Sequence, residues 1–114
     1  MIFVFGSNLA GRHGRGAALT AKRYWGAKKG EGLGHWGNSY AIPTKDENLK
    51  SLPLDMIGYR IKQFLQYAND NPQEYFILTP IGTGLAGYTV KQILSTCNME
   101  NVPSNVLFTS SWFK

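Results

Sequence analysis

The chain has 114 residues, with 12 lysines and arginines, 7 aspartates and glutamates, and a hydrophobic fraction of 43%. One cysteine, Cys97, and two histidines exclude an intrachain disulfide and give no zinc-ligand pattern. No apolar run reaches the roughly 18 residues that span a membrane, and no basic leader precedes the first apolar run. We therefore expect one cytoplasmic globular domain over residues 1–114, with no metal, no cofactor and no membrane partner.

The net charge of +5 is concentrated in the first third of the chain. Residues 1–37 contain six basic side chains against one acidic side chain, Glu31, whereas residues 38–114 contain six of each. This distribution favours an anionic ligand, either a phosphorylated small molecule or a nucleic acid. The alternative is a solvated basic surface.

The first half of the chain predicts two strands and one helix, separated by glycine-rich segments. The apolar run at 2–5 is too short for a helix and is rich in β-forming residues, so we expect a buried strand. A helix is expected over 17–25, followed by a long irregular loop over 26–38, which contains five glycines. A second strand is expected at 39–42, ending at Pro43.

The second half predicts two helices and two strands. An apolar stripe indicates a helix over 53–69, with Ser51 as its cap. The strand expected at 75–79 is almost entirely apolar, as is typical of a central strand. A helix is expected to begin at Thr89 in a capping box of the T-x-x-Q type, and a last strand is expected at 105–109.

Strands that alternate with helices predict an α/β fold whose largely parallel sheet has helices on both faces. Two glycine-rich loops each follow a strand and precede a helix, so both are expected at the carboxyl edge of the sheet, where ligands bind in such folds.

The first loop, within residues 6–18, contains Gly6, Gly11, Gly14 and Gly16. Such a loop can bring backbone N–H groups close to a phosphate, and the following helix adds a positive dipole end. The spacing matches neither a Walker loop nor a dinucleotide fingerprint.

The second loop, residues 80–88, contains three glycines and one hydroxyl and fits the same anion-binding chemistry. Lys45 and Asp46 follow the strand at 39–42 and are expected near the same edge, as a base, an acid or a ribose contact. The alternative for this pair is an exposed loop.

These motifs resemble those of the macrodomain family. Residues 81–88, IGTGLAGY, resemble that family's diphosphate-binding loop, a glycine-rich turn that ends in an aromatic residue. Residues 6–18 resemble its first ligand loop. Residues 40–44 resemble the strand that follows a long connecting segment in that family. The chain is shorter than most members and is similar to short viral and bacteriophage versions. The resemblance implies a three-layer α/β/α sandwich, with a mostly parallel or mixed sheet, that binds ADP-ribose-type ligands.

The resemblance also implies where the ligand lies. Residues 82–87 would lie at the diphosphate, Tyr88 against the distal ribose, and Asn8 and residues 14–17 near that ribose or the phosphates. The arginines of the first loop and Lys45 would hold phosphates. The candidate binding residues are Gly6, Ser7, Asn8, Arg12, Gly14, Arg15, Gly16, Ala17, Thr44, Ile81, Gly82, Thr83, Gly84, Leu85, Ala86, Gly87 and Tyr88.

Three functions stay open at this point. The first is a module that binds ADP-ribose or a related, even cyclic, nucleotide. The second is a hydrolase or phosphatase of ADP-ribose derivatives, with Asp46, Lys45 and His13 as candidate catalytic residues. Hydrolytic members commonly carry an acidic residue where this chain has Arg15 or Ala86. The third is a basic nucleic-acid-binding domain. The oligomeric state is left open.

Overall fold

A five-stranded sheet forms the centre of the molecule, with strand order β2-β3-β1-β4-β5. The computed structural model describes residues 1–114 with the side chain of Met99 left out. Four strands are parallel, and β2 pairs antiparallel with β3 at one edge. The strands are β1 (Ile2–Asn8), β2 (Gly34–Trp36), β3 (Ser39–Lys45), β4 (Phe76–Leu78) and β5 (Val106–Phe108).

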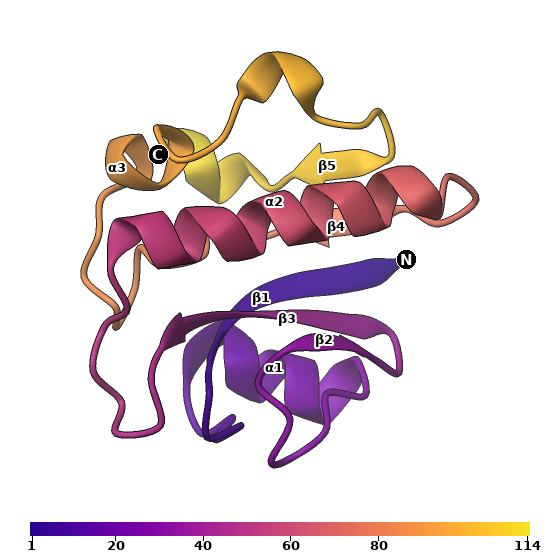
Figure 1. Ribbon diagram of the computed structural model, residues 1–114. Helices are drawn as coiled ribbons and strands as arrows, with labels where there is room; N and C mark the ends of the chain where they lie inside the picture. Colours follow the sequence, from indigo (N-terminus) through magenta and orange to yellow (C-terminus); the bar gives the residue numbers. More distant parts are fainter.

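Helices cover both faces of this sheet, so the predicted three-layer α/β/α fold is confirmed. The helix α1 (Gly16–Tyr24) lies on one face, and α2 (Leu54–Asp70) and α3 (Val90–Leu94) lie on the other (Figure 1). Short 3₁₀ turns, η1 (Met99–Asn101) and η2 (Ser110–Phe113), flank β5. None of the described helices has the length and apolarity needed to cross a membrane.

Side-chain alternation along the strands divides the interior into two cores. On β1, Val4 faces the larger core under α2 and α3, whereas Phe5 faces the smaller core under α1. The predicted stripe of α2 is confirmed, because Ile57, Ile61 and Phe64 are buried in the larger core. Only small side chains of α1, chiefly alanines, are buried in the smaller core, so α1 packs close to the sheet.

Two predictions about the first half of the chain are wrong. The segment 26–38 is not wholly irregular, because β2 forms within it by pairing with β3. Pro43 does not end its strand, which continues to Lys45. Proline removes one N–H donor, but its fixed φ is compatible with extended backbone, so the strand passes through it.

Two predictions about the second half also need correction. Ser51 does not cap α2, whose N-cap is Pro53, and the hydroxyl of Ser51 bonds to the second glycine loop instead. The apolar strand β4 is not the central strand, a place taken by β1. The capping box at the start of α3 is confirmed, with Thr89 and Gln92 bonded reciprocally.

Candidate functional site

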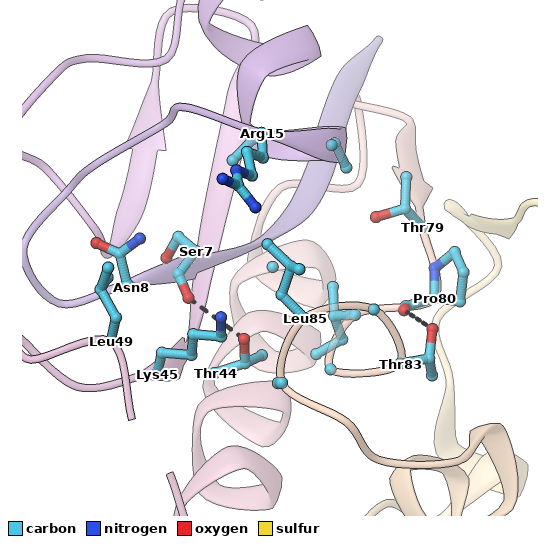
Figure 2. A pocket seen from close by; sticks show the side chains of 18 of the residues that line it. Ser7, Asn8, Arg15, Thr44, Lys45, Leu49, Thr79, Pro80, Thr83 and Leu85 are labelled. Carbon is cyan, nitrogen blue, oxygen red and sulfur yellow. Dashed lines mark hydrogen bonds between the residues drawn. The ribbon is translucent and has the colours of Figure 1, made fainter. Parts of the chain in front are cut away.

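A cavity of about 520 Å³ opens at the carboxyl edge of the sheet. Its walls come from the first glycine loop after β1, the end of β3 and the second glycine loop after β4 (Figure 2). These three strands are parallel, so their carboxyl ends reach the same edge. The fold therefore brings together segments that lie more than 70 residues apart in the sequence, such as Ser7 and Thr79.

Most of the sequence-predicted binding residues line this cavity. They are Gly6, Ser7, Asn8, Arg12, Gly14, Arg15, Gly16, Ala17, Thr44, Lys45, Ile81, Gly82, Thr83, Gly84, Leu85 and Ala86. Gly87, Tyr88, His13 and Asp46 lie outside the lining. The cavity also includes Ala18, Leu49, Thr79 and Pro80, which sequence reasoning missed. Ala18 and Pro80 lie within the two predicted glycine loops and Thr79 directly precedes the second, but nothing in the sequence around Leu49 signals a binding role.

The second glycine loop presents unpaired backbone donors. The amides of Gly82, Gly84, Leu85 and Ala86 form no hydrogen bond within the described residues. The loop closes on itself through other groups, because the Tyr88 amide donates to the carbonyl oxygen of Gly82 at 3.0 Å. Gly82 has a φ of +77°, which favours glycine. Consecutive unpaired N–H groups in such a loop form a concave site for an anion.

The first turn of α1 supplies a second group of donors to the same cavity. Gly16, Ala17 and Ala18 line it, and their amides have no partner within the described residues. The N-cap residue, Arg15, forms no side-chain cap, and no acidic residue lies in the first turn. The positive end of the helix dipole is therefore left for an external anion.

Three cationic side chains, those of Arg12, Arg15 and Lys45, also line the cavity. Arg15 extends from the start of α1, whereas Lys45 extends from the end of β3 on the opposite side (Figure 2). None of the three forms a salt bridge with a described acidic residue. The described lining contains no acidic, histidine or aromatic side chain. The site is therefore strongly electropositive.

The polar side chains of the lining mainly hold the loops in place. The Ser7 hydroxyl donates to the carbonyl oxygen of Gly32, and the Thr44 hydroxyl donates to that of Ser7 at 3.3 Å. Asn8 bonds to the Arg12 backbone through both ends of its amide, at 2.9 and 3.0 Å. One N–H donor of the Asn8 amide remains for a ligand.

Three of the expected site residues that could act on protons, or contact a ribose, have other partners. His13 is buried at 3% exposure, and its Nε2 lies 3.1 Å and 3.2 Å from the carbonyl oxygens of Lys28 and Glu31. The Asp46 carboxylate accepts from two amides of its own turn. The Tyr88 hydroxyl donates to the carbonyl oxygen of Leu52 at 2.6 Å.

Among the described side chains, no three histidine, cysteine or acidic groups gather in a cluster that could hold a metal ion. The groups that the described residues do bring to the cavity are the unpaired backbone donors and the three cationic side chains.

Comparison with known proteins supports the fold. No protein-family model and no curated protein sequence matches the chain significantly. Among solved structures, the chain is similar to the macrodomain of Mycobacterium tuberculosis DarG, with a TM-score of 0.64 and 18% identity. The match covers 94% of this chain and 86% of the DarG domain. That protein is bacterial, so the expected likeness to viral and bacteriophage versions stays a prediction. The chain therefore has a macrodomain-like fold.

Proposed function

We propose that the protein binds ADP-ribose, or a closely related nucleotide diphosphate, in the cavity at the carboxyl edge of its sheet. The observation that carries this proposal is that two elements with unpaired amides line the same cavity. The amides belong to the second glycine loop and to the first turn of α1. A diphosphate has the charge and the acceptor oxygens to use both.

The charge of the lining supports the same ligand class. Arg12, Arg15 and Lys45 would neutralise phosphate charge, and no described lining residue carries a carboxylate that would repel it. The volume of about 520 Å³ falls within the range of small-molecule sites. The macrodomain-like fold adds an expectation of ADP-ribose as the specific ligand.

Binding without cleavage is the favoured form of this function. A hydrolase would need a group that activates water at the bound ligand. The carboxylate of Asp46 is already engaged by two backbone N–H groups, and the ring of His13 is buried and bonded to the segment 26–33. The described lining of the cavity contains no carboxylate or imidazole that could serve as the general base.

Calorimetric titration with ADP-ribose, AMP, NAD and cyclic ADP-ribose tests the proposal. We expect micromolar or tighter binding of ADP-ribose that weakens as salt is raised. Gly84→Glu should abolish it, because the new carboxylate would lie beside the unpaired amides. The position suits the test, since nothing lies within 4 Å of a Cβ built there and its φ is not positive.

Gly84→Ala is the matched control, and it should keep the melting temperature and most of the affinity. Absence of heat with all four nucleotides at near-millimolar concentration would contradict the proposal. Single-stranded RNA is titrated in parallel, because RNA binding without nucleotide binding would favour the nucleic-acid function instead.

A further inference from the structure

Leu49 has an unusual backbone for its residue type. Its φ is 62°, and it is the one non-glycine residue with positive φ in the part of the chain that the structure describes. This conformation places the Cβ too close to a carbonyl oxygen, so residues other than glycine seldom adopt it. The leucine is 42% exposed and lines the cavity. Core packing does not explain this strained backbone, because the side chain is partly exposed. Strained backbone is common at functional sites, so we look for its reason in the cavity that Leu49 lines.

Asp46 builds the turn that places Leu49 there. Its Oδ1 accepts hydrogen bonds from the amides of Asn48 at 2.8 Å and Lys50 at 2.9 Å. Two backbone hydrogen bonds close the turn. The Asp46 amide donates to the carbonyl oxygen of Lys50 at 2.8 Å, and the Leu49 amide donates to the carbonyl oxygen of Asp46 at 3.1 Å. The carboxylate thus stabilises the conformation in which the leucine side chain reaches the cavity.

The turn lies at one defined end of the cavity. It follows Lys45, which is the register partner of Asn8 on the neighbouring strand. In Figure 2, Leu49 and Asn8 lie at the opposite end from Thr79, Pro80 and Thr83. The sequence resemblance places Asn8 near the distal ribose or the phosphates, and of these two groups only the ribose offers an apolar surface to a leucine side chain.

We propose that Leu49 is a specificity-determining residue that packs against the distal ribose, and that Asp46 is its positioning residue. This inference rests on the proposed function. The C–H face of a sugar offers an apolar surface that a leucine side chain can cover. That contact would also exclude water from hydrogen bonds between the ribose hydroxyls and the remaining donor of Asn8.

The test compares ADP-ribose with ADP, which lacks the distal ribose. Calorimetry is carried out on the wild type, Leu49→Gly and Leu49→Asn, because glycine and asparagine both tolerate the left-handed backbone. We expect both variants to lose about tenfold in affinity for ADP-ribose, as burial of a leucine side chain implies. Their affinity for ADP should stay within about twofold, and the melting temperature of Leu49→Gly should be unchanged or higher.

Asp46→Ala, which removes the acceptor of both amide hydrogen bonds, tests the positioning role through a double-mutant cycle. Alone it should lower the preference for ADP-ribose over ADP. In the Leu49→Gly background it should cause no further loss, since the leucine through which it acts is gone. A further loss of equal size would overturn the positioning role.

Two other results separate the two proposals. Wild-type protein that binds no nucleotide would overturn the proposed function itself. Wild-type binding of ADP-ribose that Leu49→Gly and Leu49→Asn leave unchanged, or a parallel loss for ADP and ADP-ribose, would overturn the role of Leu49 alone.

Discussion

The hydroxyl of Ser51 donates a hydrogen bond of 2.6 Å to the carbonyl oxygen of Ala86, which lies in the second glycine loop. In the reverse direction, the hydroxyl of Tyr88, two residues after Ala86, donates to the carbonyl oxygen of Leu52, the residue after Ser51, at 2.6 Å. Because Ser51 also bridges to Lys45, these bonds connect the glycine loop to the end of β3. The loop that presents the unpaired amides is therefore held to the opposite wall of the cavity.

The first prediction concerns this connection. Ser51→Ala and Tyr88→Phe each remove one hydrogen bond and should each lower the free energy of unfolding by about 1 kcal/mol. The double variant should also weaken ADP-ribose binding severalfold, because the ligand must then order the loop. Urea denaturation and calorimetry measure the two effects. Ser95→Ala is the control, since its exposed hydroxyl bonds within the α3 end, away from the cavity. Equal affinity in the double variant and the control would contradict the prediction.

Sequence reasoning could place the cavity because the evidence for it is local. Each glycine loop follows an apolar strand and precedes a helix, and parallel pairing then brings both loops to one edge. The capping box at Thr89 is likewise contained in four consecutive residues. In contrast, β2 is a three-residue edge strand whose pairing partner, β3, decides its structure. Its composition alone therefore predicted a loop.

The roles of single polar side chains could not be predicted, because their partners are distant in sequence. Ser7 bonds to Gly32 across 25 residues, and Ser51 bonds to Ala86 across 35. Both serines therefore connect distant segments. Ser51 does so in place of the expected helix cap, whereas Ser7 also lines the cavity, and its contact with a ligand stays a prediction. Leu49 is the converse case. It reaches the cavity because of a left-handed turn, and the hydrophobic pattern of the sequence does not predict such a turn.

The second prediction concerns the close approach of the segment 26–33 to the first loop. A Cβ built on Gly32 would lie 1.9 Å from the carbonyl oxygen of Asn8, a backbone atom that cannot move alone. Gly32→Ala should therefore lower the free energy of unfolding by on the order of 3 kcal/mol or more, as measured by urea denaturation. Gly14→Ala is the matched control, because nothing lies within 4 Å of its Cβ and its φ is not positive. Similar stabilities for the two variants would show that the loops separate at little cost.

The third prediction assigns His13 to the fold. Its ring packs edge-on against Phe5, with 5.4 Å between the centroids, and its Nε2 joins the first loop to two carbonyl groups of the segment 26–33. His13→Ala should cost about 2–4 kcal/mol of unfolding free energy by urea denaturation, from lost packing and lost hydrogen bonding.

The control for His13 is the second histidine. His35 is exposed and bonds to the Tyr67 hydroxyl and the Gly37 carbonyl oxygen, so His35→Ala should cost only about 1 kcal/mol. A His13→Ala protein as stable as the wild type would refute the structural role and return His13 to the candidates for catalysis.

The last prediction concerns the reactivity of Cys97, which lines a small apolar cavity together with Ile61 and Ile93. Burial raises the pKa of its thiol, and the positive charge of Lys62 offsets part of that rise. Because alkylation requires the thiolate, the folded protein holds less of the reactive form at neutral pH than the unfolded chain does. Iodoacetamide should therefore modify the folded protein more slowly than the urea-unfolded chain. The pH of half-maximal rate should also be higher in the folded protein. An equal or lower half-maximal pH in the folded protein would mean that the thiol is activated, and Cys97 would then deserve a test as a nucleophile.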